Sequence, residues 1–216
     1  MYLPEKFSQH DRGAIHELIR LHPLGCLVTA GGNGLTANHI PLLLRDTDTG
    51  NGTLMGHIAK ANPMTEFAKR PSETLVVFQG PNAYISPSWC PSKADKHEIV
   101  PTWNYAVVHA HGQLEIIQDK AWIRAHLDDL TQEFEAQAGE HWSLSDAPDT
   151  YVERLVEHVV GIRIPIDKLV GKWKTTIREA EINLARVTDS LTAMGTDDAT
   201  DMVRLIAERY GVGRDG

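Results

Sequence analysis

GHIAKANPMTEFAKR, residues Gly56 to Arg70, reads as a strand that ends directly at the start of a short helix. Asn62 is a good N-cap, and Pro63 suits the first helical position. The inward face of this helix would consist of Met64, Phe67 and Ala68. A helix start leaves backbone N–H groups unpaired and carries about half a positive charge, so Lys60 beside it predicts an anion or phosphate site. The alternative is an ordinary strand-to-helix corner with a solvated lysine.

Short apolar runs separated by turn residues lie on both sides of this corner. The run GGNG, Gly31 to Gly34, is a strong hairpin signal. Val100 to Ile117 is the longest β-like stretch, and Gly112 predicts a turn that divides it into two strands. The other predicted strands are Gly25–Ala30, Leu35–Leu44, Thr53–Ala59, Thr74–Gly80, Ala83–Trp89 and Gly161–Ile166. This spacing favours a closed or partly open antiparallel barrel over a doubly wound sheet.

Helical periodicity follows most of these strands. Asp11 predicts the cap of a helix that ends near His22, and Asp119 caps a helix after the long β-like stretch. The apolar face of that second helix would be Ile123, Leu127, Leu130 and Phe134. Further helices are predicted over about 150–160 and about 178–210, the latter interrupted near Gly195. The predicted fold class is therefore mainly β with α, an α+β fold with peripheral helices and a helical C-terminal segment.

Composition limits the function classes. The 216 residues carry a formal net charge of −8, which argues against the broad basic surface that nonspecific nucleic-acid binding requires. Cys26 and Cys90 match no Cys-x-x-Cys spacing, so neither a zinc ribbon nor a disulfide framework is predicted. No run approaches the ~20 apolar residues that span a bilayer, and the N-terminus has no signal-peptide core. We therefore expect a cytoplasmic protein without a membrane segment.

Five separated motifs carry a family resemblance. They are MYLPEKF (1–7), TANHIPLLL (36–44), GHIAKANPM (56–64), VVFQGPNAYISPSWCPSK (76–93) and VPTWNYAVVHAHG (100–112). In this order they resemble the PaiB family of FMN-binding negative transcriptional regulators. That family has the flavin-binding split β-barrel fold, which pyridoxamine 5′-phosphate oxidases share. The resemblance implies an FMN-binding split-barrel domain over residues 1–177 and a C-terminal helical extension, residues 178–216, packed on the same domain.

The resemblance also implies a homodimer that holds a flavin in each of two clefts between subunits. The FMN phosphate and ribityl chain would lie at the corner, whose wall would be His57, Ala59, Lys60, Asn62 and Pro63. Asn38 and His39 would approach the same ligand from the neighbouring strand. Because alternate residues of a strand face opposite sides, only one of these two side chains can face the ligand unless the strand bulges. The pattern does not decide between Asn38 and His39.

Residues 83–105 are rich in Trp, Tyr, Ser and Pro. Trp103 and Tyr105 share a strand face, opposite Asn104. Large flat side chains with a polar edge can wall an isoalloxazine ring or fill a dimer interface. In a split-barrel dimer the cleft is also the interface, so we expect one of these two faces to lie at the partner subunit's flavin site.

Other chemistry-bearing residues point to no additional site. The charged run with Lys93, Asp95, Lys96, His97 and Glu98 is typical of an exposed loop. His109 and His111 share a strand face, but no third ligand follows at a recognisable spacing, so no metal site is predicted. After KLVGKWK, Lys168 to Lys174, family members continue with a polar run of the type Ser-Gln-Asn-Arg. This chain instead reads TTIREAEINL, so a ligand contact from that run is in doubt here.

Three function hypotheses follow, and no catalytic residue is predicted. The first is a flavin-binding regulator, in which FMN or its redox state alters the dimer and a partner. Direct DNA binding is doubtful, since the stretch DDATDMVRLIAERYGVGRDG is acidic and no helix-turn-helix with a basic helix is seen. The second is an FMN-dependent oxidoreductase acting on a small molecule. The third is a flavin-free scaffold or haem-binding relative, with His39, His57 or His109 as candidate iron ligands.

Overall fold

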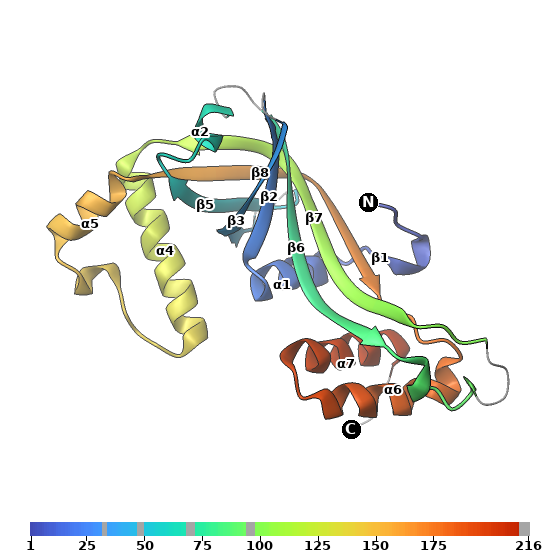
Figure 1. The fold of residues 1–216 in the computed structure, drawn as a ribbon. Coiled ribbons are helices and arrows are strands. Elements are labelled where there is room, and N and C mark those ends of the chain that lie inside the picture. The colour runs from blue at the N-terminus through green and yellow to red at the C-terminus, as the bar shows by residue number, and fades with distance from the viewer. Residues whose placement is uncertain (32–33, 47–49, 68–71, 94–97, 212–216) are drawn as a thin grey trace. The chain divides into compact units, whose positions relative to one another are not determined.

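A computed structural model describes residues 1–31, 34–46, 50–67, 72–93 and 98–211. Its strands are β1 (Ser8–Gln9), β2 (Leu24–Gly31), β3 (Gly34–Pro41), β4 (Leu43–Arg45), β5 (Thr53–Ala59), β6 (Ser72–Ile85), β7 (Thr102–Ile117) and β8 (Val159–Lys174). Its α-helices are α1 (Arg12–Leu21), α2 (Met64–Phe67), α4 (Lys120–Ala138), α5 (Asp149–Val156), α6 (Ala180–Met194) and α7 (Asp197–Tyr210). Short 3₁₀ helices are η1 (Glu5–Phe7), η2 (Pro87–Trp89) and η3 (Leu144–Asp146). Figure 1 traces these elements along the chain.

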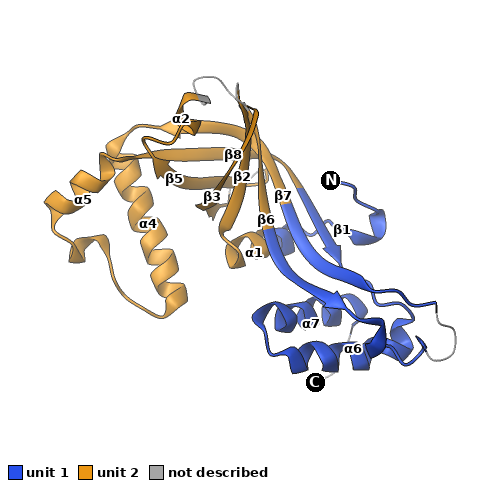
Figure 2. Ribbon diagram, in the orientation of Figure 1, with its two compact units in different colours: residues 1–15, 79–108, 170–216 blue, residues 16–78, 109–169 orange. Residues whose placement is uncertain are grey.

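The strands form one antiparallel sheet in the order β3-β2-β6-β7-β8-β5-β4, with β1 paired to β8. The chain divides into two compact units, shown in Figure 2. Unit 1 comprises residues 1–15, 79–108 and 170–216, and unit 2 comprises residues 16–78 and 109–169. The long strands β6, β7 and β8 contribute residues to both. The predicted α+β class, with an antiparallel sheet and C-terminal helices, is confirmed.

Unit 2 contains the predicted hairpin. Strands β2 and β3 pair from Leu24 opposite Pro41 to Gly31 opposite Gly34, and the tip residues Gly32 and Asn33 lie outside the described residues. On the other side β5 pairs with both β4 and β8. Apolar side chains of β2, β5, β6 and β8 are buried between the elements, including Leu27, Leu54, Val76, Phe78, Ile162 and Ile164. Helices α4 and α5 share a smaller core of Ile123, Val152 and Val156.

Unit 1 has its own apolar core. Helices α6 and α7 meet at a turn in which Gly195 adopts a φ of 65°, a conformation that glycine tolerates well. Buried residues of both helices pack with residues of β6 and of the chain after β8. The cluster contains Ala83, Ile85, Cys90, Ile177, Val187, Leu191, Ala199, Met202 and Ile206. The helices thus share a core with earlier parts of the chain, while a domain boundary at residue 177 stays a prediction.

Both predicted acidic N-caps are confirmed. An Asp11 carboxylate oxygen accepts the N–H groups of Gly13 and Ala14 at 2.7 and 3.3 Å. The Asp119 carboxylate accepts the N–H of Trp122 at 2.7 Å, at the start of α4. These bonds satisfy donors that a helix start otherwise leaves unpaired.

Several strand predictions are wrong at their boundaries. β7 runs unbroken through Gly112, because that glycine permits close approach of β8: a Cβ there would lie 2.2 Å from the Pro165 carbonyl oxygen. The predicted strand 35–44 divides at Leu42, whose N–H donates to the Pro23 carbonyl instead of to a neighbouring strand. The run 161–166 is part of the longer β8, and the end of the predicted strand 83–89 forms η2.

Candidate functional site

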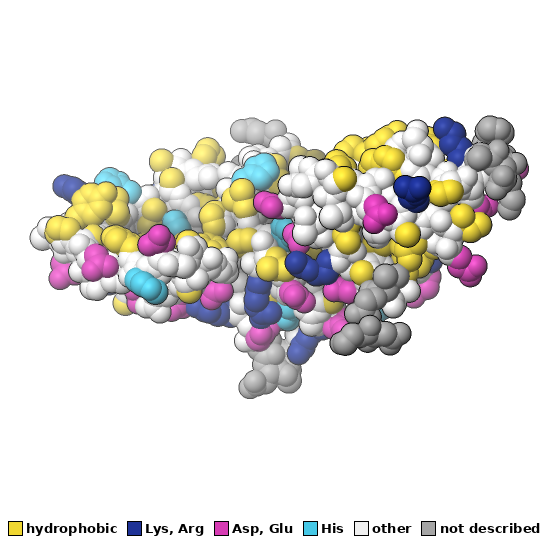
Figure 3. Space-filling model, turned by 90° about the horizontal axis from the view of Figure 1, so that it is seen from below, with side chains coloured by type: hydrophobic (Ala, Val, Ile, Leu, Met, Phe, Trp, Pro, Cys, Tyr) yellow, Lys and Arg dark blue, Asp and Glu magenta, His cyan; other side chains and the backbone are white. Residues whose placement is uncertain are grey.

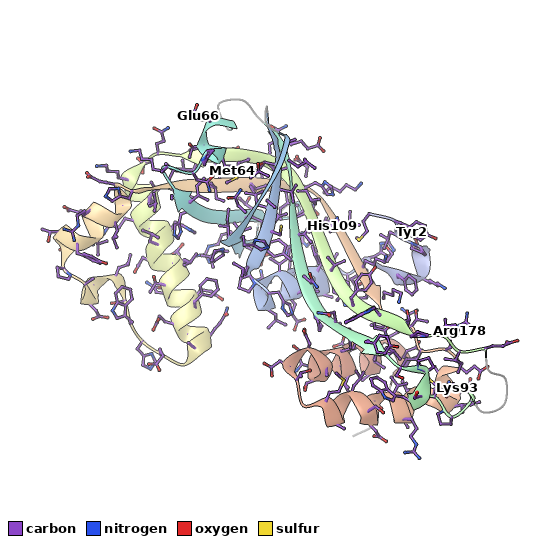
Figure 4. The ribbon with its side chains drawn as sticks, viewed as in Figure 1. Tyr2, Met64, Glu66, Lys93, His109 and Arg178 are labelled. Carbon is purple, nitrogen blue, oxygen red and sulfur yellow. The ribbon has the colours of Figure 1, made fainter. Side chains whose placement is uncertain are left out.

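Asn62 organises the corner between β5 and α2. Its side-chain oxygen accepts the N–H of Met64 at 2.9 Å, so the predicted capping role is confirmed. Its own N–H donates to the Ala59 carbonyl at 2.9 Å, which closes the turn after the strand. Pro63 is exposed and directly precedes α2, so it lies one position before the first helical residue, whereas the sequence had predicted it at that first position. Figure 4 labels Met64 and Glu66 on this helix, whereas Ala68 lies outside the described residues.

The expectation that unpaired helix amides face a ligand is wrong. The N–H of Met64 is bonded to the Asn62 side chain, that of Thr65 to the Asn62 carbonyl at 3.0 Å, and that of Glu66 to the Pro63 carbonyl at 3.1 Å. The short turn satisfies its own first donors because Asn62 folds back over it. An anion at this corner would therefore depend on side chains, not on bare backbone amides.

Asn38 is the neighbouring-strand residue that faces the corner. Its side-chain oxygen accepts from the Asn62 side-chain amide at 3.0 Å, and its amide nitrogen lies 3.7 Å from the Met64 sulfur. His39 is exposed and alternates to the other face of β3. The structure thus brings Asn38 and Asn62 together and leaves His39 away from them, while the choice of which side chain faces a ligand stays a prediction.

Lys60 and Ala59 are both exposed at the end of β5. The Lys60 backbone N–H donates to the His158 carbonyl at 2.8 Å, so the backbone is anchored while the side chain is solvated. The charge of Lys60 reaches a neighbouring carboxylate: the pKa of Glu157 is lowered, chiefly by its hydrogen bond to Lys120 and more weakly by His158 and Lys60. The corner therefore combines one exposed ammonium group, a pair of amides and a nearby acid.

The structure packs His57 against helix α4. Its Nδ1 lies 3.4 Å from Nε2 of His126 on α4, and the His126 ring stacks on Trp122 with centroids 5.3 Å apart. Trp122 in turn occupies the space over Gly161, where a Cβ would lie 2.2 Å from the indole ring. Burial lowers the pKa of His57. It also lowers the pKa of His126 to about 4, with a further contribution from His57.

His126 and Trp122 were missed by sequence reasoning. Their positions after the Asp119 cap identified a helix, but no local signal connects residue 126 with residue 57. The half-buried His57 side chain contacts α4 of its own chain, and its place in the wall of a ligand site stays a prediction.

Trp103 and Tyr105 lie in unit 1, on the strand face that was predicted for them. Trp103 is 55% exposed and meets Tyr84, which is 43% exposed, edge to face with ring centroids 6.0 Å apart. The Lys172 ammonium lies 5.2 Å from the Tyr105 ring centroid and donates to the carbonyl of Tyr2, which Figure 4 labels. On the opposite face Asn104 is fully buried, and neither polar atom of its side chain has a hydrogen-bond partner among the residues that the structure describes.

The remaining predictions concern the histidine pair of β7, the charged run, metal binding and membrane segments. The rings of His109 and His111 lie on one face of β7 with centroids 6.4 Å apart. Asp95, Lys96 and His97 of the charged run lie outside the described residues. Within the described ranges, no group of three or more His, Cys, Asp or Glu side chains is arranged to hold a metal ion. Helices long and apolar enough to cross a membrane are likewise not found in the part of the chain that the structure describes.

Comparison with known proteins places these features in a family. The family model described as "Putative FMN-binding domain" matches residues 1–168. The chain belongs to this family. An uncharacterized protein of Emericella nidulans is 30% identical over 97% of each chain. The protease synthase and sporulation protein PAI 2 of Bacillus subtilis is 27% identical, over 97% of this chain and 98% of its own.

A solved structure supports the fold of this FMN-binding family member. The FAD and heme binding protein from Mycobacterium smegmatis superposes with a TM-score of 0.59 at 16% identity, over 82% of this chain and 78% of that one. At this identity the likeness shows the fold alone. Together with the family match and the similarity to PAI 2, it confirms the PaiB resemblance and the split-barrel fold class predicted from the motifs.

Proposed function

We propose that this chain is a flavin-binding regulatory protein of the PaiB type, a homodimer that holds FMN between subunits and alters the behaviour of a partner. One observation carries the proposal. The similarity to PAI 2 extends over 97% of this chain, whereas the FMN-binding family model ends at residue 168. The relationship therefore includes helices α6 and α7, which lie beyond the matched domain.

The residues at the β5–α2 corner fit an FMN group in their chemistry. Lys60 supplies an exposed positive charge for a phosphate, and phosphate is well bound by charge-assisted hydrogen bonds. The amides of Asn38 and Asn62 donate and accept, as the hydroxyl groups of a ribityl chain or the polar edge of a flavin ring require. Ala59 and Pro63 add exposed surface beside them. A bound flavin would supply the redox chemistry, and the protein would position it.

The exposed aromatic pair of unit 1 supports the dimer part of the proposal. Tyr84 and Trp103 present large amphipathic rings to solvent in this chain. Aromatic side chains of this kind are enriched at protein interfaces. In the proposed dimer, the face that carries Trp103 and Tyr105 would lie at the flavin site of the partner subunit.

The charge distribution of the chain does not favour a regulatory effect through a basic DNA-reading helix. Helix α7 begins with Asp197 and Asp198, and the whole chain carries a net charge of −8. On the face drawn in Figure 3, Lys and Arg side chains form small groups separated by acidic and hydrophobic ones. Tight DNA binding depends on contiguous positive charge that displaces counterions from phosphates. We therefore propose that the partner is reached through other contacts.

The deciding experiment is an absorption spectrum of the purified protein before and after addition of FMN, combined with light scattering on a sizing column. We expect a flavin spectrum shifted by binding and the mass of a dimer. A protein that takes up no FMN, or that remains a monomer when loaded, would contradict the proposal.

The same sample distinguishes the other hypotheses. Bleaching of bound FMN by NADH or NADPH would identify an oxidoreductase, and a Soret band on haem titration would identify a haem-binding relative. A gel shift at low salt tests direct DNA contact, for which we expect no shift.

A further inference from the structure

A cavity of about 280 Å³ lies entirely within unit 1. Four separate stretches of the chain line it, around residues 6–7, 85–90, 99–102 and 174–178. The last of these begins at the end of the KLVGKWK segment, residues 168–174. None of the residues predicted to hold FMN lines the cavity.

The floor of the cavity is apolar. Phe7, Ile85, Cys90 and Ile177 line it and are almost completely buried. Burial, together with the charge of Glu179, raises the pKa of the Cys90 thiol, so this cysteine is a small apolar wall residue and not a nucleophile. A ligand that enters would place apolar atoms against this floor. The ligand and the floor would both lose contact with water, which favours binding.

The rim of the cavity carries three cations, Lys6, Lys174 and Arg178. Within the part of the chain that the structure describes, the hydrogen-bond partners of Lys174 and Arg178 are neutral, and the Lys6 ammonium lies over the Phe7 ring. Lys174 donates to the hydroxyl of Thr102 and to the carbonyl of Trp103, and Arg178 donates through Nη1 to the Glu98 carbonyl at 2.8 Å. A guanidinium carries five N–H donors, so one such bond does not saturate it. Figure 4 labels Arg178 after the end of β8.

The electrostatics of this rim favour an added anion. Burial, and then the nearby charge of Lys172, lower the pKa of Lys174, so its ammonium form is disfavoured where it lies. Glu179 is the acidic neighbour at the β8–α6 junction, and it is exposed. Among the described residues that line the cavity, three are cationic and none is acidic, and an anion in the cavity would lie close to these cations.

The wall that carries Arg178 is held in place by the C-terminal helices. The Tyr210 hydroxyl accepts the N–H of Ile177 at 3.1 Å and donates to the Thr175 carbonyl at 3.3 Å. Asn183, fully buried on α6, donates to the Arg178 carbonyl at 2.8 Å. These bonds fix the backbone of residues 175–178. Thr176 is one of the lining residues, and its hydroxyl is buried without a hydrogen-bond partner among the described residues, although such groups are normally satisfied.

We propose that this cavity is a binding site for a small organic anion, a carboxylate or phosphate group attached to an apolar body. The anionic group lies at Lys174 and Arg178, where it also accepts the hydrogen bond of the Thr176 hydroxyl. The apolar body packs against Phe7, Ile85 and Ile177. This site does not depend on flavin binding at the β5–α2 corner.

Calorimetry with the full chain tests the proposal with four probes: benzoate, phenyl phosphate, the neutral benzamide and inorganic phosphate. We expect benzoate or phenyl phosphate to bind, and the preferred one identifies the head group. Benzamide, which lacks the charge, and inorganic phosphate, which lacks the apolar body, are each expected to bind about tenfold more weakly or not at all.

Matched variants locate the site. Arg178→Gln should weaken binding of the preferred probe by about tenfold, whereas Arg186→Gln, an exposed arginine on α6 outside the cavity, should not. Thr176→Val removes the unpartnered hydroxyl at nearly constant shape. It should leave the melting temperature unchanged or higher and still weaken the probe, a combination that a purely structural threonine would not give.

Several outcomes would overturn the proposal. They are no binding of either anionic probe, equal binding of benzamide, equal binding of inorganic phosphate and phenyl phosphate, or an affinity that Arg178→Gln does not change. Displacement of the probe by FMN would make the cavity part of the flavin site and would also refute a separate one. Because apo protein is used, failure of the flavin proposal leaves these results interpretable.

Discussion

The buried His126 predicts that stability falls in mildly acidic solution. The residue is 1% exposed, and its ring lies between His57 and Trp122. Its Nδ1 has no hydrogen-bond partner within the described ranges. Burial, followed by the charge of His57, lowers its pKa to about 4. The charged groups nearest to it, Asp129 and Arg45, act in opposite directions and pair with each other at 2.7 Å.

The sign and size of the effect follow from linkage. In the unfolded chain a histidine takes up a proton near pH 6.5, but in the folded chain His126 does so only near pH 4. Between these values the unfolded state binds more protons, so folding stability is fully present above pH 6.5 and is lost as the pH falls. The whole difference corresponds to about 3 kcal/mol, of which about 2 kcal/mol is lost by pH 5. His57, whose pKa burial also lowers, adds in the same direction.

Urea unfolding followed by tryptophan fluorescence between pH 7.5 and 5 measures this loss. His126→Phe keeps a flat ring against Trp122 but cannot titrate, so the pH slope of its unfolding free energy should be smaller by up to about 1.4 kcal/mol per pH unit. His141→Gln, at an exposed histidine, serves as the control and should keep the wild-type slope. The reasoning is refuted if the wild type is equally stable at both ends of the range, or if His126→Phe retains the full slope.

Three further predictions concern single side chains. Lys60→Ala should weaken FMN affinity by about 1–3 kcal/mol in a fluorescence titration while Lys168→Ala does not, and an unchanged affinity removes Lys60 from the site. Gly112→Ala should lower the unfolding free energy by about 1–3 kcal/mol or more, because its Cβ meets the β8 backbone; equal stability would show that β7 and β8 are farther apart. Asp119→Ala should cost about 1 kcal/mol through loss of the α4 cap, and a smaller change in urea melts would indicate that water replaces the bond.

Elements whose signal is local could be predicted from the sequence. The caps Asp11 and Asp119 act on N–H groups two or three residues away, and Gly195 ends α6 through its own backbone conformation. The hairpin between β2 and β3 likewise depends on neighbouring residues. In each case the residues that decide the structure lie within one short window of sequence. The local pattern therefore contains all the information that the prediction needs.

Strand ends were less predictable because distant residues decide them. Gly112 looks like a turn residue in sequence, yet its role is to admit the Pro165 carbonyl of β8. Leu42 interrupts an apolar run because its N–H bonds to Pro23, before the preceding strand begins. A glycine or an apolar residue gives the same local signal whether a strand ends or continues there. Only the residues that contact it from distant parts of the chain distinguish the two cases.

The candidate sites show the same limit more strongly. The Asn62 cap was predictable from its own neighbourhood, but its bond to Asn38 and the closure of the α2 amides changed what the corner offers to an anion. The cation-rimmed cavity of unit 1 is assembled from four stretches that are far apart in sequence. Its Thr176 and Arg178 occupy the stretch where a polar run was expected and missed. This stretch now lines a cavity, and a binding measurement with Arg178→Gln decides whether that cavity has a ligand of its own.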